Sequence, residues 1–440
     1  MDKTIEKIVS LCKRRGFVFQ SSDIYGGFSA VYDYGPLGIE LKNNISQLWW
    51  KEMTHVHENI VGLDSGILMH PKIWEASGHV GAFNDPLVDC KKCKSRYRAD
   101  EFSNDFVSIN WQETKCPKCG TTGNLTNPRQ FNLMFKTNVG PVEETGTEAF
   151  LRPETAQGIY VNYQLVQGAM RLKIPFGIAQ IGKAFRNEII ARNFIFRTRE
   201  FEQMEMQYFV KPGTDDAIFN DWKNKRLNFY LDKLGISKDR LRFHQHGKDE
   251  LAHYAKEAWD IEYNFPFGWS EIEGIHNRTD YDLNRHEEFS GKNLSYFDQP
   301  NNDRFLPYVI ETSAGLNRML LTILADAYWE DKKNNRIVMK FDPKIAPIKA
   351  VICPLVKKDG LPEMAREIMD ILSPHFKVIY DQQGSIGKRY YRQDEAGTPF
   401  GITVDHKSLE ENTITMRDRD SMKQERISID QLLETIRKVI

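Results

Sequence analysis

The sequence predicts an α+β domain over residues 1–342, interrupted by a small cysteine-rich insertion at 85–128, and an α/β domain over 343–440. Three observations support this division. Helix and strand patterns are mixed in the first part, two Cys-x-x-Cys pairs lie inside the insertion, and Pro343 and Pro347 break regular structure before the second part. At 440 residues, the chain is long enough for two or three domains of ordinary size.

The expected elements of the first domain follow from hydrophobic periodicity. They are, in order, a helix with Ile5, Ile8, Val9 and Cys12 on one stripe, a glycine- and aromatic-rich loop or strand pair at 25–38, a helix at 39–53 and a strand that ends near 66–71. Helices are then expected at 155–171, 215–234 and 314–325, and strands at 260–265, 269–275 and 307–313. In the second domain, strands at 349–354, 377–380 and 401–404 alternate with helices that end near 373 and 395.

The overall charge is nearly balanced, with 60 Lys and Arg against 61 Asp and Glu. No strong global field therefore attracts nucleic acid, and RNA contacts must come from local basic segments such as 13–15, 388–392 and 417–419. The N-terminal segment lacks the apolar block of a secretory signal, and no apolar run approaches the roughly 20 residues of a membrane span. We expect a cytoplasmic protein with no membrane partner.

Four of the six cysteines form two pairs, Cys90 with Cys93 and Cys116 with Cys119, and a glycine follows the second pair. Two Cys-x-x-Cys knuckles about twenty residues apart have the spacing of a zinc ribbon, so these four thiolates are the predicted ligands of a structural Zn²⁺. Two disulfides are the first alternative, which a reducing compartment disfavours. A degenerate knuckle that keeps its cysteines without a metal is the second.

Two charged segments, 184–188 and 197–205, predict a nucleotide-binding hairpin. Residues two apart on a strand share a face, which groups Gln180, Arg186 and Glu188 on the incoming strand. The returning strand would present, on one face, Arg197, Arg199, Phe201, Gln203 and Glu205. Cations, an aromatic ring and carboxylates suit phosphates, a purine and an ammonium group respectively. A solvated charged hairpin is the alternative, but it would not require this order of residue types.

The same segments resemble motif 2 of the class II aminoacyl-tRNA synthetases, Phe-Arg-x-Glu followed by a short loop and Arg-x-x-x-Phe-x-x-x-Glu. Residues 311–318 resemble motif 3, a strand, a glycine and an arginine at the start of a buried helix, although Asn317 replaces the acid that often precedes this arginine. The helix at 39–53, the following strand and Pro71 resemble motif 1. The resemblance implies an antiparallel catalytic sheet flanked by helices, and a homodimer joined through motif 1.

The class II resemblance also implies a chemistry. The carboxylate of an amino acid attacks the α-phosphorus of ATP, and the enzyme works by alignment and charge neutralisation. Arg186 and Arg318 are the implied catalytic residues, Phe201 would stack on adenine, and Glu271 would bind Mg²⁺. The implied ATP-binding residues are Arg186, Asn187, Glu188, Phe196, Arg197, Thr198, Arg199, Glu200, Phe201, Glu271, Ile272, Gly315, Leu316, Asn317 and Arg318. An arginine held only by a neighbouring carboxylate is the alternative for Arg318.

Over nearly its whole length, the chain resembles the dimeric glycyl-tRNA synthetases, through residues 25–28, 34–38, 74–79, 152–158, 199–205 and 271–274. This resemblance implies glycine and tRNA(Gly) as substrates, and an anticodon-binding domain at 343–440. A pocket lined by acids would bind the ammonium group and exclude larger side chains, so no editing domain is required. The implied glycine-binding residues are Arg98, Glu154, Phe201, Glu202, Gln203, Met204, Glu205, Glu311, Thr312, Ser313, Ala314 and Gly315.

The sequence disfavours three alternative functions. Residues 384–388 lack the spacing of a phosphate-binding P-loop, and Arg389 follows where Ser or Thr would be needed, so their basic and aromatic neighbours better suit an RNA-facing helix. A synthetase for threonine, proline or serine is disfavoured by the acidic pocket. A non-catalytic relative, such as the accessory subunit of mitochondrial DNA polymerase, is disfavoured because Arg186, Glu188 and Arg318 are all present.

Overall fold

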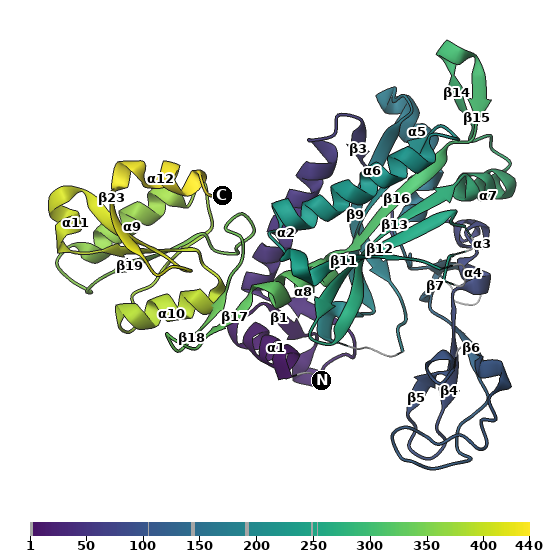
Figure 1. The fold of residues 1–440 in the computed structure, drawn as a ribbon, viewed down its shortest axis with the longest axis horizontal. Coiled ribbons are helices and arrows are strands. Elements are labelled where there is room, and N and C mark those ends of the chain that lie inside the picture. The colour runs from purple at the N-terminus through teal and green to yellow at the C-terminus, as the bar shows by residue number, and fades with distance from the viewer. Residues whose placement is uncertain (1–2, 104, 142–145, 190–192, 248–249, 253) are drawn as a thin grey trace.

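A twisted sheet forms the centre of the larger part of the molecule in the computed structural model, which describes residues 3–103, 105–141, 146–189, 193–247, 250–252 and 254–440 (Figure 1). Within these ranges, seven strands pair in the order β11-β12-β13-β16-β10-β9-β3. Their bounds are β3 Ile60–Gly62, β9 Phe176–Phe185, β10 Glu200–Val210, β11 Leu241–Gln245, β12 Glu257–Phe265, β13 Gly268–Thr279 and β16 Tyr308–Gly315. All neighbours are antiparallel except β3 and β9, which confirms the predicted antiparallel sheet flanked by helices.

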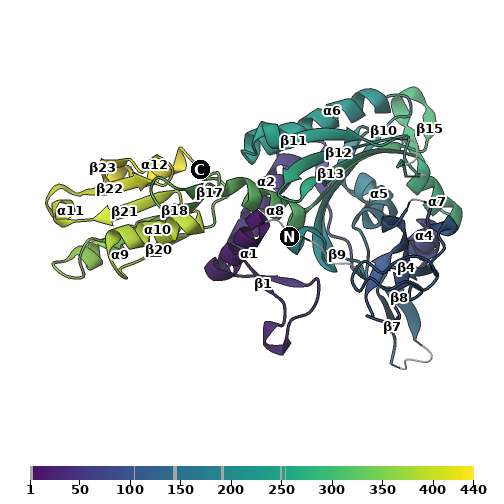
Figure 2. The same cartoon turned by 60° about the horizontal axis from the view of Figure 1, so that its bottom comes forward.

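Helices cover the sheet, as the apolar stripes of the sequence predict (Figure 2). Those that contact it are α2 Pro36–Thr54, α5 Ala156–Met170, α6 Asp215–Asn228, α7 Tyr281–Ser290 and α8 Leu316–Ala327. Three further helices pack at its margins: α1 Lys3–Arg15 against α8 and β1, and α3 Lys72–Ala76 against α7 and α4 His79–Ala82. Two short hairpins, β1 Val18–Gln20 with β2 Tyr32–Tyr34 and β14 Tyr296–Asp298 with β15 Asp303–Phe305, extend from this body. The strand expected to end near 66–71 ends earlier, at Gly62, because after Leu63 the chain leaves the edge of β9 and only Leu68 forms a further bridge, to Leu151.

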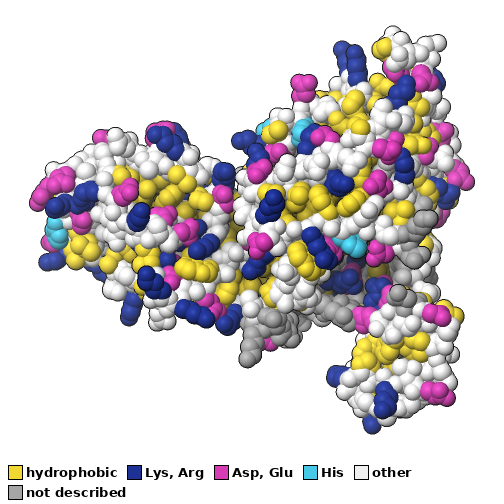
Figure 3. Space-filling model, in the orientation of Figure 1, with side chains coloured by type: hydrophobic (Ala, Val, Ile, Leu, Met, Phe, Trp, Pro, Cys, Tyr) yellow, Lys and Arg dark blue, Asp and Glu magenta, His cyan; other side chains and the backbone are white. Residues whose placement is uncertain are grey.

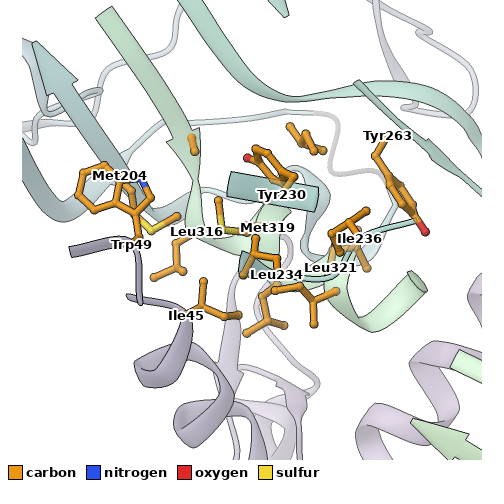
Figure 4. Close-up of a cluster of buried hydrophobic side chains, with 14 of the residues drawn as sticks. Ile45, Trp49, Met204, Tyr230, Leu234, Ile236, Tyr263, Leu316, Met319 and Leu321 are labelled. Atoms are coloured by element: carbon orange, nitrogen blue, oxygen red, sulfur yellow. The ribbon is translucent and has the colours of Figure 1, made fainter. Parts of the chain in front are cut away.

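The main core lies between α2, α8 and the sheet (Figure 4). Ile45 and Trp49 of α2 and Leu316 and Met319 of α8 are fully buried, and they pack with Met204 of β10. Burying each large apolar side chain contributes roughly 1.5–3 kcal/mol to folding. This core therefore holds the start of α8 and the middle of β10 in a fixed relation, and both carry residues of the predicted site.

The insertion projects from the body as a small separate lobe, at the lower right of the space-filling view (Figure 3). Its strands are β4 Asn84–Asp89, β5 Arg96–Arg98 and β6 Arg129–Asn132, and the hairpin β7 Lys136–Val139 with β8 Thr147–Phe150 follows. Val88, Ala99, Trp111 and Leu125 form its own small core together with the cysteines. A core this small needs an additional constraint to be stable, which the four cysteines can provide.

The C-terminal part is a separate α/β layer, as predicted, built around the sheet order β20-β19-β21-β22-β23. Its elements are β19 Ala350–Pro354, α9 Leu361–Leu372, β20 Val378–Tyr380, α10 Ile386–Ala396, β21 Phe400–Val404, α11 His406–Glu411, β22 Thr413–Asp418, β23 Gln424–Ser428 and α12 Ile429–Arg437. It has its own hydrophobic core between α9, α12 and the sheet. A hairpin of β17 Tyr328–Asp331 and β18 Arg336–Met339 precedes the connecting segment and packs against α10.

Three of the arginines predicted to contact RNA are buried. Arg389, Arg417 and Arg419 are each less than 5% exposed, and their guanidinium groups donate to carboxylates or backbone carbonyls of the same chain. The prediction of RNA contacts is therefore wrong for these three residues. A basic segment has the same appearance in the sequence whether its charges face solvent or buried acids.

Candidate active site

One hollow, about 210 Å³ in volume, collects most of the charged residues predicted for the site. It lies on one face of the sheet, over β10, β13 and β16, beside the first turn of α8. The lining residues are Glu154, Arg186, Glu188, Phe196, Arg197, Thr198, Phe201, Gln203, Glu205, Tyr254, Glu271, Gly274, His276, Arg278, Glu311, Ser313, Gly315, Asn317 and Arg318. At one end, Arg186 lies over the ring of Phe201 and Arg318 over that of Phe196. At the other end lie the buried acids Glu205 and Glu311, and Arg278 pairs with Glu311.

The register between β9 and β10 places the motif 2 residues on one face. Phe201 lies opposite Ala184, and Glu205 lies opposite Gln180. Every second side chain of β10, from Phe201 to Glu205, therefore lines the hollow, as predicted. Arg186 follows the end of β9, where its backbone N–H donates to the carbonyl of Arg199. The predicted hairpin pairing is therefore present, although β9 ends before Arg186 and β10 begins after Arg199.

Arg186 is held in place on three sides. Its Nε donates to the carbonyl of Pro153 at 3.0 Å, and its guanidinium lies 5.3 Å from the ring centroids of both Phe83 and Phe201. Cation–π contacts of this kind fix the plane of a guanidinium without consuming its remaining donors. Arg186 can therefore offer those donors to an anion in the hollow.

Arg318 occupies the first turn of α8, as predicted. It stacks over Phe196 with 4.4 Å between the guanidinium carbon and the ring centroid, and its Nη1 lies 3.1 Å from Oε2 of Glu271. An arginine near a helix N-terminus is unfavourable for the helix dipole, which would favour an anion at this position. In the structure, the anion nearest to this arginine is the carboxylate of Glu271, whose side chain is about half exposed at the edge of the hollow.

Glu205 is the most deeply buried acid at the opposite end. Ser313 Oγ donates to its Oε1 at 2.7 Å, Gln203 Nε2 donates to the same oxygen at 3.0 Å, and Thr155 Oγ1 donates to Oε2 at 2.5 Å. Burial, followed by repulsion from nearby Glu311 and Glu154, raises the pKa of Glu205 to about 8. The group is therefore ready to lose a proton when a cation approaches.

Glu311 behaves in the opposite way because it has strong partners. Burial alone would raise its pKa, but Arg278, at 3.1 Å, and His276, at 2.8 Å, outweigh burial and lower that pKa to about 2. Arg278 also donates to both carboxylate oxygens of Asp282, at 2.7 and 2.9 Å. Glu154 likewise has a pKa well below its usual range, because His79 and Arg278 outweigh its burial.

Several predicted ATP-binding residues do not line the hollow. Asn187 bonds to Leu133 through its backbone, Arg199 donates to the carbonyls of Glu188 and Ser29, and Glu200 pairs with Lys183. Ile272 and Leu316 are buried in the core, with their side chains directed away from solvent.

The glycine-binding set divides in the same way. Glu154, Phe201, Gln203, Glu205, Glu311, Ser313 and Gly315 line the hollow. Arg98 instead pairs with Asp85 and Asp100, Glu202 pairs with Lys42, and Met204, Thr312 and Ala314 are buried. On β10 and β16, these buried residues alternate with residues that line the hollow.

Four residues that line the hollow were not predicted from the sequence: Tyr254, Gly274, His276 and Arg278. Arg278 is 4% exposed and lies 3.9 Å from the ring centroid of Tyr254. A signal was present for three of the four, since Gly274, His276 and Arg278 are two residues apart on β13, and Gly274 and His276 lie opposite Ser313 and Glu311. Tyr254 belongs to a loop and has no such signal.

The four predicted zinc ligands come together at the tip of the insertion. Their sulfur atoms all lie within 4.8 Å of one another, with 3.7 Å between those of Cys90 and Cys119 and 3.6 Å between those of Cys93 and Cys116. Zn–S bonds of about 2.3 Å in a tetrahedron require sulfur atoms at about this separation. Thr121 Oγ1 lies 2.9 Å from Sγ of Cys119, a contact of the kind that orients a ligand. The donor set fits Zn²⁺, which would hold the lobe together.

We expect protein prepared without chelators to contain about one Zn²⁺ per chain, because four convergent thiols form one tetrahedral site. Elemental analysis measures this ratio directly. Removal of the metal should loosen the lobe, which has only a small apolar core, and should make it sensitive to proteases. A ratio near zero, with four thiols titratable in the folded protein, would contradict the assignment.

Comparisons with known proteins agree with this geometry. Residues 103–327 match the tRNA synthetase class II core domain (G, H, P, S and T), and residues 349–439 match the anticodon binding domain. The glycine–tRNA ligase of Treponema denticola is 61% identical over 99% of this chain and 97% of its own length. The chain belongs to the glycine–tRNA ligase family.

Other relatives in this family are almost as similar. The glycine–tRNA ligase of Borrelia hermsii is 57% identical over 99% of this chain and 97% of its own, and that of Thermobifida fusca is 52% identical over 98% and 96%. Prolyl-tRNA synthetase from Cryptosporidium parvum, solved with L-proline and AMP, has a TM-score of 0.66 over 100% of this chain and 79% of its own. At 14% identity, that likeness shows the fold alone.

Proposed function

We propose that the hollow joins glycine to ATP, forming glycyl-adenylate, and then transfers the glycyl group to the 3′ end of tRNA(Gly). The observation that carries this proposal is one hollow with fixed arginines and rings at one end and buried acids at the other. The first end suits a nucleotide and the second an ammonium group, in a chain of the glycine–tRNA ligase family.

In the first step, a carboxylate oxygen of glycine attacks the α-phosphorus, a new P–O bond forms, and the bond to pyrophosphate breaks. Arg186 holds the glycine carboxylate and the α-phosphate, and Arg318 binds the γ-phosphate of a bent ATP. Phe201, whose ring lines the hollow, stacks on adenine. The charge that builds up on the phosphorus oxygens is neutralised by groups already in position, which lowers the barrier without reorganisation.

Glu271 is the acid that we assign to Mg²⁺, which class II synthetases use with ATP and which neutralises phosphate charge when bound. Its half-exposed carboxylate faces the hollow, but in the structure it is paired with Arg318. Incoming phosphates compete for Arg318 and so release Glu271 for a cation. The ion pair between Arg318 and Glu271 thus holds both side chains at the hollow before ATP binds.

At the other end, Glu205, Glu311 and Glu154 surround the ammonium group, and Ser313 positions Glu205. The side chains that bind the ammonium group also occupy the space that a larger amino acid would need. Selection for glycine therefore rests on exclusion by size, which is stronger than selection for an added methylene.

In the second step, a terminal ribose hydroxyl of tRNA(Gly) attacks the carbonyl carbon, and AMP leaves. The C-terminal domain, residues 343–440, binds the anticodon. We also propose a cytoplasmic homodimer joined through the motif 1 elements. Apolar side chains exposed on or near α2 and β3, Ile39, Val56 and Leu68, support that interface. No helix in the described ranges is long and apolar enough to cross a membrane.

The test of the proposed activity is charging of unfractionated tRNA with labelled glycine. The expected product is an ester at the tRNA 3′ end, with AMP and pyrophosphate formed in equal amounts. Hydrolysis of ATP to ADP, or labelling that does not need tRNA, would contradict the proposal.

The raised pKa of Glu205 predicts a pH dependence for glycine binding. Below pH 8 the free carboxyl is mostly protonated, and binding of an ammonium group must displace that proton. Glycine affinity should therefore increase with pH, by up to about tenfold per unit, and level off near pH 8. Glycine KM in an exchange assay from pH 6 to 9 measures this, with ATP KM as the control. A flat glycine profile below pH 8 would show that Glu205 is already ionised.

A further inference from the structure

The two domains are joined by buried ion pairs that the chemistry of the hollow does not use. The hairpin β17–β18 of the larger part lies against α10 of the C-terminal part (Figure 1). From β18, Arg336 donates to Asp331 of its own hairpin at 2.9 Å and to Asp394 of α10 at 2.7 Å. The side chains of Arg336 and Asp394 are each only 1% exposed. We call these residues, with Arg417, the joint cluster.

The hydrogen bonds of the joint cluster depend on the relative orientation of the two domains. Arg417 donates to both oxygens of Asp394, at 2.9 and 3.0 Å, while Nη1 of Arg336 also donates to the carbonyl of Arg419 at 2.8 Å. Because the donors of a guanidinium form a rigid fork, such contacts are satisfied in only one relative orientation of the two parts. Buried charges left unpaired are costly, so partial separation of the parts is disfavoured.

Contacts outside the joint cluster also hold the two domains in one relative position. From α1, Arg15 pairs with Glu395 of α10 at 2.5 Å, and Arg14 lies 3.3 Å from the same acid. From α2, Asn44 Nδ2 donates to the carbonyls of Ile345 and Ala346 in the connecting segment, each at 3.1 Å. Arg419 donates to the carbonyl of Phe341 at 2.9 Å. The connecting segment is therefore packed at both ends and does not behave as a free linker.

We propose that the joint cluster and the Arg15–Glu395 pair are positioning residues for tRNA charging. They hold the C-terminal domain at one place relative to the hollow, so that a tRNA bound there delivers its 3′ end to the adenylate. This inference rests on the proposed function. Adenylate formation uses only the residues of the hollow and does not need the joint. Transfer depends on placement, where an error of about 1 Å can cost on the order of 100-fold.

Arg336→Met tests the joint cluster with little damage elsewhere, because Asp394 keeps Arg417 and Asp331 keeps Asn334 as partners. We expect glycine-dependent pyrophosphate exchange within about twofold of wild type, and a fall of about 10- to 100-fold in kcat for charging, with the KM for tRNA nearly unchanged. The fall appears in kcat because tRNA still binds a folded but misplaced domain. Arg242→Met, which removes an exposed arginine paired with Glu262 on the neighbouring strand, is the matched control and should change neither rate.

Charge reversal tests the Arg15–Glu395 pair separately. Glu395→Arg places a third cation beside Arg14 and Arg15, and should lower kcat for charging while exchange is kept. Adding Arg15→Glu restores an ion pair across the joint and should recover most of the loss. Trypsin cleavage after exposed Lys344 reports opening of the joint, because Ile345 and Ala346 are buried. Cleavage should be faster in Glu395→Arg and in Arg336→Met, and slow again in the double variant.

Three outcomes would overturn the inference: an equal fall of exchange and charging, a rise in the KM for tRNA at constant kcat, or unchanged charging in a variant that trypsin cleaves faster. The first would mean that the joint supports the catalytic fold, and the second that these residues support tRNA binding itself. Failure of the proposed function has a different signature, since the wild-type protein would then show no glycine-dependent exchange.

Discussion

Replacing Arg186 by alanine is expected to slow adenylate formation by about 100-fold or more while ATP binding weakens much less. The arginine is fixed between Phe83 and Phe201 and by the carbonyl of Pro153, so in the proposed mechanism its free donors meet the α-phosphate without reorganisation. The charge that it offsets develops fully only in the transition state, so its loss affects the rate more than the affinity. Single-turnover formation of glycyl-adenylate, with ATP affinity measured separately, gives both quantities.

Lys183→Ala is the matched control for Arg186→Ala. Lys183 lies on β9, which ends one residue before Arg186, is about half exposed and pairs with Glu200 outside the hollow. The control should keep near wild-type adenylation. If Arg186→Ala adenylates at the wild-type rate, or loses ATP binding in the same proportion as rate, Arg186 does not have the role assigned to it.

Replacing Glu205 by glutamine should lower kcat/KM for glycine by about 30-fold or more and leave the KM for ATP unchanged. The substitution keeps the size of the side chain but removes the charge that faces the ammonium group. Truncating one partner of a buried charge pair typically costs about 2–5 kcal/mol, which corresponds to this range. It should also abolish the increase of glycine affinity with pH, since no group at this position would then titrate near pH 8. Exchange kinetics with varied glycine and ATP measure all three effects.

Ser313→Ala provides the graded comparison for Glu205→Gln. It removes one neutral donor to Glu205, and a single hydrogen bond of this kind contributes about 0.5–1.5 kcal/mol, so the expected loss is only about 2- to 12-fold. A loss in Ser313→Ala as large as in Glu205→Gln would indicate that the pocket collapses. Wild-type glycine kinetics in both variants would place the ammonium group elsewhere.

Much of the site could be predicted because its information is local. The alternation of Phe201, Gln203 and Glu205 on β10 follows from the two-residue period of a strand. Likewise, Gly315 followed by a helix places Arg318 on the first turn, and the spacing of the cysteines brings their sulfur atoms together. In each case a few neighbouring residues determine where a side chain points.

The two-residue period of β13 could have indicated Arg278, but the burial of Arg278 and of Arg417 depends on partners distant in the chain. Arg278 lines the hollow because it pairs with Asp282 and with Glu311, which is 33 residues away. Arg417 is buried because it meets Asp394, which itself receives Arg336 from the other domain. A basic residue has the same local signature on a solvated face and in a buried pair, so only the tertiary structure distinguishes RNA-facing from internal arginines.

Pyrophosphate exchange into ATP across a panel of amino acids is the sharpest test of whether the hollow activates glycine. Glycine, alanine, serine, threonine and proline are supplied one at a time to the wild-type protein, with ATP, Mg²⁺ and labelled pyrophosphate. We expect rapid exchange with glycine and a rate near background with the other four, because the proposed pocket binds the ammonium group with acids that occupy the space a side chain would need. Exchange with alanine or serine equal to that with glycine, or no exchange with glycine, would contradict it.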